Sequence, residues 1–138
     1  RQALDLYRQH YRPSARNPEP IATVCVWALT GESEEAVEFE FMSRAHSRLA
    51  RDRGVLQAVV SPESAAAQSY SAVEKARIAV LRDEAIIGTP AQVGAQLRDL
   101  ARQLDIDELV ILTWTHGLAA RKRSYELLAA EFAIGPDE

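Results

Sequence analysis

Two stretches of the chain are apolar without interruption, and both predict strands. Residues 21–29 read IATVCVWAL and residues 109–113 read LVILT, with Trp114-Thr115-His116-Gly117 closing the second run. Neither run alternates apolar with polar positions, as a half-exposed strand does, and β-branched residues are frequent in both. Such runs are typical of parallel strands that are buried on both faces. We therefore predict two parallel strands in one layer, near residues 21–29 and 109–115.

Most of the remaining sequence has helical periodicity. After an acidic first turn, apolar residues recur at fourfold spacing and predict a helix from about residue 33 to Gly54. The stripe consists of Val37, Phe41, Ala45 and Leu49. Further helices are expected at about residues 2–11, 72–82, 90–104 and 118–133. On the helix at 72–82, Val73, Ala76 and Val80 are expected to face inward.

Two of the predicted helices begin with a clear start signal. A short helix is predicted to begin at Ser61-Pro62, where a capping hydroxyl precedes a proline at the first helical position. The N–H group that proline lacks would have no partner within the helix at that position. Thr89-Pro90-Ala91-Gln92 adds a glutamine that can reach back to the cap, as in a capping box. The helices from about residues 33, 90 and 118 are expected to cover one side of the sheet.

The order of elements is helix, strand, helices, strand, helix, which predicts a parallel β-α-β unit with an inserted helical stretch. We interpret residues 1–138 as a single, partial domain. Each buried strand has at most one partner in this chain, so its missing neighbours must come from other sequence or from another copy. Because the chain opens on Arg1 without an initiating methionine, we expect an excised or processed fragment.

Composition narrows the function classes. With 47% hydrophobic residues, 26% charged residues and a net charge of −4, the chain is an ordinary globular protein with no electrostatic case for nucleic acid or an anionic membrane. No apolar run approaches the roughly 20 residues needed to span a bilayer, so we expect no membrane association and a cytoplasmic location. His10 and His46 lack a second ligand at metal spacing, which predicts no metal site. The single cysteine, Cys25, has apolar neighbours and is expected to be a packed side chain.

Four stretches together resemble the C-terminal segment of luciferase-like flavin-dependent monooxygenases. They are residues 22–29, residues 61–65 (SPESA), residues 87–93 (IGTPAQV), and residues 107–116 (DELVILTWTH) followed by 119–129 (AARKRSYELLA). Each motif is common alone, and their order and spacing carry the resemblance. One departure is Thr30-Gly31-Glu32-Ser33, which stands where relatives usually have an Ala-Asp-Thr type of turn.

The resemblance implies a fold and an activity. It implies the C-terminal portion of an α/β (β/α)8 TIM barrel, namely the last two parallel strands and their helices, with 21–29 as the seventh strand and 109–115 as the eighth. The parent protein is then expected to be an enzyme in which reduced FMN, supplied by a flavin reductase, reacts with oxygen to oxidise an aldehyde or another small organic substrate. With six strands absent, this chain alone is expected to be inactive and to retain no FMN.

In such a barrel, functional groups lie at the carboxyl ends of strands. The candidate cofactor-binding residues are therefore Trp114, Thr115 and His116, which offer an aromatic surface, a hydroxyl and an imidazole. Alternation along the strand turns Trp114 and His116 one way and Thr115 the other, and the sequence does not show which side lines the barrel. Catalytic residues are not predicted.

Two other functions stay open at this point. The first is a deazaflavin-dependent oxidoreductase of the same superfamily, which transfers hydride without oxygen. The second is a non-catalytic module that associates with copies of itself. In either case the partial sheet leaves apolar strand surface uncovered, so we expect a homo-oligomer whose interface includes residues from 21–29 or 109–116.

Overall fold

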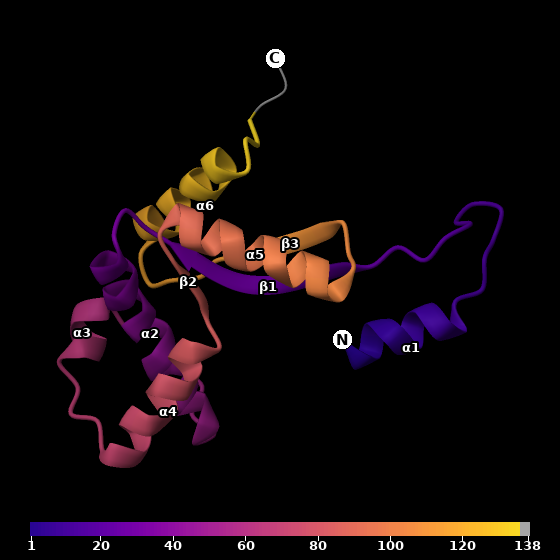
Figure 1. Ribbon diagram of the computed structural model, residues 1–138. Helices are drawn as coiled ribbons and strands as arrows, with labels where there is room; N and C mark the ends of the chain where they lie inside the picture. The colour runs from indigo at the N-terminus through magenta and orange to yellow at the C-terminus, as the bar shows by residue number, and fades with distance from the viewer. Residues whose placement is uncertain (136–138) are drawn as a thin grey trace.

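The computed structural model describes residues 1–135, which form a three-stranded sheet with six helices (Figure 1). In chain order the elements are α1 (Gln2–His10), β1 (Thr23–Thr30), α2 (Glu34–Asp52), α3 (Pro62–Ala66), α4 (Ala72–Asp83), β2 (Ile86–Gly88), α5 (Pro90–Leu104), β3 (Glu108–Leu112) and α6 (Leu118–Glu131). The predicted α/β class is confirmed, and the predicted helices are all present. No helix within residues 1–135 combines the length and the apolar character needed to cross a membrane.

The sheet is parallel throughout, and its longest strand, β1, lies at the centre. Residues 23–27 of β1 pair with residues 108–112 of β3, and residues 28–30 pair with residues 86–88 of β2. The predicted parallel pairing of the two apolar runs is therefore confirmed. The first part of β1 is therefore paired along one edge by β3, and its last three residues are paired along the other edge by β2.

The prediction of only two strands was wrong, because β2 lies between them in sequence. Its three residues, Ile86, Ile87 and Gly88, are too few to show a strand pattern, and they stand between a helix and the Thr89 start signal. The sheet order is β2-β1-β3. In a (β/α)8 barrel, strands that follow one another in sequence are neighbours, so this order differs from the sequential order of a barrel.

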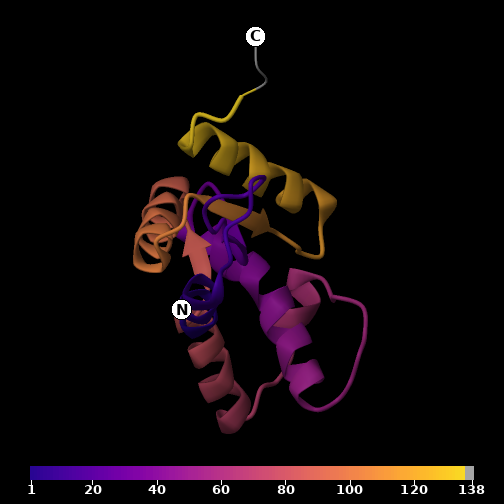
Figure 2. The ribbon, with the colours of Figure 1, turned by 90° about the vertical axis from the view of Figure 1, so that its right-hand side faces the viewer.

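Helices cover both faces of β1, not one as the sequence analysis predicted. Leu29 packs with the stripe of α2, with Leu81 of α4 and with Ile87. Ala28, which points to the opposite face, packs with Val93 and Leu97 of α5 and with Leu128 of α6. Figures 1 and 2 show α2 and α4 on one side of β1 and α5 and α6 on the other. The alternation of side chains along β1 separates these two cores.

Part of the sheet is open on the face that α2 covers elsewhere. Cys25 is exposed, and Val110 and Leu112 are each 46% exposed, because α2 and α4 reach only the carboxyl end of β1. The predictions that Cys25 is packed and that both strands are buried on both faces were therefore wrong. The apolar face formed by Cys25, Val110 and Leu112 is called the open face below.

The helix signals in the sequence correspond to real contacts. The Ser33 hydroxyl accepts the Ala36 N–H at the start of α2, and the Ser61 hydroxyl accepts the Ser64 N–H at the start of α3. At α5 the Gln92 side chain accepts the Thr89 N–H at 2.9 Å. These bonds satisfy backbone donors that the first helical turn leaves free.

The inward face of α4 differs from the prediction. Val73 is 80% exposed and Val80 is 46% exposed, and Ala76 is exposed as well. Leu81 is buried in the core instead, and Ile78 packs beside it. The helix is mixed in composition, so several stripes fit its sequence, and the contact with α2 selects the one containing Leu81.

Hydroxyl side chains continue the pairing of β1 where β3 ends. Thr113, directly after β3, donates its hydroxyl to the Ala28 carbonyl at 2.7 Å. Ser124 of α6 accepts the Thr30 N–H at 3.0 Å, and Thr30 donates its own hydroxyl to the Gly88 carbonyl at 2.8 Å. All three hydroxyl-bearing residues are buried. Backbone groups that would otherwise be buried without a partner are thus satisfied.

The α5–α6 contact depends on a residue without a side chain. A Cβ atom added at Gly94 would lie 2.6 Å from Oε1 of Glu131, which is closer than non-bonded atoms approach. The Glu131 carboxylate instead lies over Gly94 and accepts from Nη1 of Arg98 at 2.8 Å. The absence of a side chain at Gly94 therefore makes room for an ion pair between the two helices.

Thr113→Val is expected to lower the free energy of unfolding by about 1 to 3 kcal/mol, because it removes a buried donor from the Ala28 carbonyl at constant volume. Thr23→Val is the matched control: Thr23 is exposed at the other end of the same sheet, and its hydroxyl donates only to the carboxylate of Glu108 in an exposed contact, where such changes cost less than about 0.5 kcal/mol. Urea unfolding followed by circular dichroism measures both. Equal losses for the two variants would contradict the role assigned to Thr113.

Candidate functional site

The predicted residues after β3 do not share one pocket. The Thr115 hydroxyl donates to the Gly117 carbonyl at 2.9 Å. The His116 ring is exposed, and its Nδ1 lies 2.9 Å from the Val59 carbonyl oxygen, which ties it to the segment before α3. Trp114 is half-buried and turns toward α2. The Thr115 hydroxyl and the Nδ1 atom of His116 are thus engaged within the chain.

Trp114 belongs to a cluster that joins the sheet to α2. The guanidinium carbon of Arg44 lies 4.0 Å from the ring centre of Trp27 and 5.1 Å from that of Trp114. The two tryptophans are also linked directly, since the Trp27 indole N–H donates to the Trp114 carbonyl at 3.3 Å. Both contacts of Arg44 lie within the range of cation–π interactions. The indole rings thereby hold the arginine side chain against the sheet.

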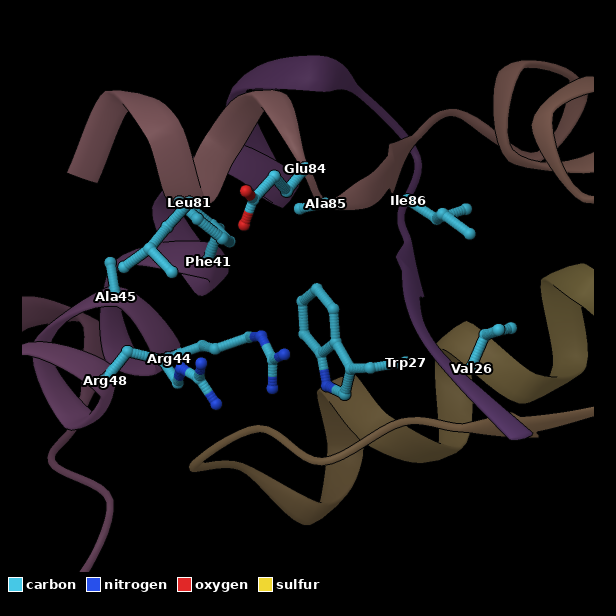
Figure 3. A pocket seen from close by; sticks show the side chains of 10 residues that line it. All are labelled: Val26, Trp27, Phe41, Arg44, Ala45, Arg48, Leu81, Glu84, Ala85 and Ile86. Carbon is cyan, nitrogen blue, oxygen red and sulfur yellow. The ribbon is translucent and has the colours of Figure 1, made fainter. Parts of the chain in front are cut away.

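A cleft lies beside this cluster, between α2, the end of α4 and the middle of β1 (Figure 3). Its volume is about 260 Å³. Seven of its ten lining residues are apolar, namely Val26, Trp27, Phe41, Ala45, Leu81, Ala85 and Ile86, and Arg44, Arg48 and Glu84 supply the charges. The exposed surface of the cleft is about equally polar and apolar, as suits a small organic molecule with a charged group.

The two arginines of the cleft have no anionic partner among residues 1–135. Neither Arg44 nor Arg48 forms an ion pair there, whereas seven other arginines do; these are Arg8, Arg53, Arg77, Arg82, Arg98, Arg102 and Arg123. The Nε atom of Arg48 is buried without a hydrogen-bond partner. Burial, reinforced by the charges of Arg48 and Arg51, lowers the pKa of Arg44 to about 10. Two cationic side chains without an ion-pair partner in residues 1–135 therefore face the cleft against one carboxylate, that of Glu84.

Glu40 lies one helical turn before Arg44 and is also partly buried. Burial is the main cause that raises the pKa of its carboxyl group, with a smaller contribution from the charge of Glu63 and an opposing one from His116. Its Oε2 atom and the hydroxyl oxygen of Ser43 are buried without a hydrogen-bond partner in the described chain. Glu40, Ser43, Arg44 and Arg48 therefore form a polar stripe on α2, next to its apolar stripe.

The sequence analysis did not predict this polar stripe. It assigned the acidic start of α2 to solvent and used Phe41 and Ala45 to define the buried face. The signal was present in the spacing, because Glu40, Arg44 and Arg48 recur every four residues and lie on one face of a helix. Their burial depends on Trp27 and Trp114, which come from other segments, and no local pattern reveals that contact.

Comparison with known proteins identifies relatives over most of the chain. A Bacillus subtilis protein named YwcH is 34% identical over 128 residues, which cover 92% of this chain and 38% of that protein. An Escherichia coli K12 protein named luciferase-like monooxygenase is 30% identical over 126 residues, which cover 91% of this chain and 38% of that protein. The chain thus spans 38% of the length of these relatives. No family model matches it.

The fold is similar to that of a solved protein. The crystal structure of apo-MsnO8 matches with a TM-score of 0.80 over 99% of this chain and 42% of that chain, at 21% sequence identity. At this identity the match establishes a shared fold. It includes the sheet and the helices on both of its faces, since it extends over nearly all of the chain.

Glu40→Gln is expected to stabilise the fold relative to the unmodified chain more at about pH 7 than at about pH 3. A carboxyl group whose pKa is raised on folding destabilises the folded state above that pKa, and the penalty is relieved as the pH falls. Glutamine carries no charge and avoids the penalty at both pH values. Urea unfolding at the two pH values measures the difference.

Glu35→Gln on the same helix is the control with the opposite sign. Hydrogen bonds to its own backbone N–H and to Ser33 lower the pKa of the Glu35 carboxyl group. Its stabilisation is present above the unfolded pKa and is lost as the pH falls through the folded pKa. Glu35→Gln is thus expected to destabilise at about pH 7, and a shift of the same sign for both variants would refute the assignment.

Proposed function

Because this chain belongs to the luciferase-like monooxygenase family, we propose that it is part of an enzyme that uses reduced FMN and oxygen to oxidise a small organic substrate. The observation that carries the proposal is the 30% identity, over 91% of the chain, to the Escherichia coli luciferase-like monooxygenase. Reduced flavin would come from a flavin reductase. The cofactor performs the oxygen chemistry, and the protein orients and shields it.

The length of the relatives supports a partial site. Since the chain spans 38% of the relatives' length, we propose that the rest of a relative-sized polypeptide contributes the remainder of the active site. We place the chain at the C-terminal end of that polypeptide, as the resemblance of residues 107–129 implies. In that arrangement β1 and β3, which are adjacent and parallel, are consecutive strands of a (β/α)8 barrel, and β2 is an additional short strand beside the carboxyl end of β1.

We expect that the residues of this chain hold no FMN by themselves. The cleft beside Trp27 has a volume of about 260 Å³, below the roughly 300 to 1,000 Å³ of typical ligand pockets, and FMN is a large ligand. The Thr115 hydroxyl and the His116 imidazole already contact backbone carbonyls, and one arginine packs against Trp114. The assignment of Trp114, Thr115 and His116 to the cofactor stays a prediction, and no step of the flavin reaction is assigned to them.

The polypeptide encoded by the whole gene is expected to oxidise a long-chain aldehyde when FMN, NADH and a flavin reductase are supplied. The isolated 138-residue chain is expected to show neither this activity nor flavin absorbance after gel filtration, because most of a flavin pocket lies outside it. Product formation is measured by mass spectrometry. Retention of stoichiometric FMN by the isolated chain would contradict the partial-site proposal.

A control separates the two kinds of flavin chemistry. The same polypeptide is assayed under argon with FMN and its reductase, where an oxygen-dependent reaction stops, and in parallel with oxidised deazaflavin, which accepts a hydride without oxygen. Turnover that requires deazaflavin and continues without oxygen would refute a monooxygenase and favour the hydride-transferring alternative.

The open face favours a second candidate function, a module that associates with a second copy of itself. Val110 and Leu112 are each 46% exposed, Cys25 lies beside them in register, and β3 is an edge strand. Exposed strand edges and apolar patches are typical of interaction surfaces. Each buried leucine contributes about 1.5 to 3 kcal/mol on leaving water. We therefore propose that the open faces of two chains pack together when no other segment covers them.

Leu112→Lys is expected to weaken this association at least about tenfold, because it places a charge in the apolar contact. Leu56→Lys is the matched control, since Leu56 is 82% exposed in the segment before α3, away from the open face. Sedimentation equilibrium at micromolar concentration measures both. A folded monomer at that concentration would rule out the module.

A further inference from the structure

The cleft beside Trp27 combines apolar residues with two cationic side chains. These are Arg44 and Arg48, which lie side by side on α2 (Figure 3). Neither guanidinium group has an anionic partner within residues 1–135. Two like charges one helical turn apart destabilise each other, so an anion between or beside them would be bound favourably.

The stacking of Arg44 leaves its hydrogen-bonding edge free. Cation–π contact with Trp27 and Trp114 uses the flat face of the guanidinium group, whereas its N–H groups point outward in the plane. A planar carboxylate accepts two such N–H groups at once. Arg48 lies on the same wall, and the N–H groups of its guanidinium other than the buried Nε–H offer further donors.

Glu84 restricts the kind of anion. It belongs to the opposite side of the same cleft, at the end of α4, and its carboxylate turns toward the cavity in Figure 3. With Glu84 set against Arg44 and Arg48, the charged side chains of the cleft sum to one positive charge, which a single carboxylate balances. A doubly charged phosphate would leave one negative charge in excess and costs more to remove from water. Phe41, Leu81 and Ile86 supply apolar surface for the rest of the molecule.

We propose that this cleft binds a small organic carboxylate, with its carboxylate on Arg44 and Arg48 and its apolar body against Trp27 and Phe41. The binding itself depends only on these residues. The proposal rests on the proposed function in one respect, which is that the bound molecule is a substrate or product of the enzyme. An aliphatic aldehyde oxidised to its acid would yield a product of this class.

The chain provides its own reporter of binding. It contains two tryptophans, Trp27 and Trp114, and both contact Arg44. A ligand that draws the Arg44 guanidinium toward its carboxylate changes the surroundings of both indoles. The intrinsic fluorescence therefore reports on this cleft without a label.

The test titrates the chain with benzoate, benzamide and phenyl phosphate at constant ionic strength and follows tryptophan fluorescence. Benzoate is expected to give a saturable change. Benzamide, which has the same shape without the charge, is expected to bind at least about tenfold more weakly than benzoate. Phenyl phosphate is also expected to bind more weakly than benzoate. Equal responses to benzoate and benzamide would overturn the proposal, and tighter binding of phenyl phosphate would overturn the assignment to a carboxylate.

Arg48→Gln and Arg44→Gln are each expected to weaken benzoate binding about tenfold or more. Arg12→Gln is the control, because Arg12 lies exposed in the segment after α1 and does not line the cleft; the affinity of this variant for benzoate should stay within about twofold. Far-UV circular dichroism verifies folding. Undiminished benzoate binding by a folded Arg48→Gln variant would overturn the proposal. A failed flavin assay with intact benzoate binding would contradict the proposed enzyme and not the binding site.

Discussion

The structure depends on how β1 satisfies its backbone at the carboxyl end. The strand has eight residues, but β3 accompanies only the first five and β2 only the last three. On the side where β3 has ended, the hydroxyl groups of Thr113 and Ser124 complete the hydrogen bonds. Without them, polar backbone groups would be buried between two apolar cores. Through these bonds, α6 and the β3–α6 connection are attached to the central strand.

The two cores on either side of β1 were predictable to different degrees. The stripe of α2 is regular, so Val37, Phe41 and Ala45 were identified from spacing alone. β2 was not predictable, because three residues next to a helix start carry no strand signal. The exposure of Cys25 could not be predicted from the sequence either. An apolar run indicates that a strand can be buried, but it does not show which face of the strand a helix covers.

The site was the least predictable part. The position of Trp114 directly after a strand made it a candidate site residue. Its partner Arg44 lies about seventy residues away, on a helix whose pattern the apolar stripe already accounted for. Contacts between distant segments decide whether a charged side chain on such a helix is solvated or buried. The arrangement of Arg44 between Trp27 and Trp114 follows from the α2–sheet packing, which only the fold reveals.

The close approach of α5 and α6 at Gly94 has a consequence for how substitutions there combine. A Cβ atom at position 94 would meet the Glu131 side chain, so alanine is accommodated when that side chain turns away. Turning would remove the Glu131 carboxylate from Arg98. The effects of substitutions at positions 94, 98 and 131 on stability are therefore expected to be non-additive, as for residues that share one contact.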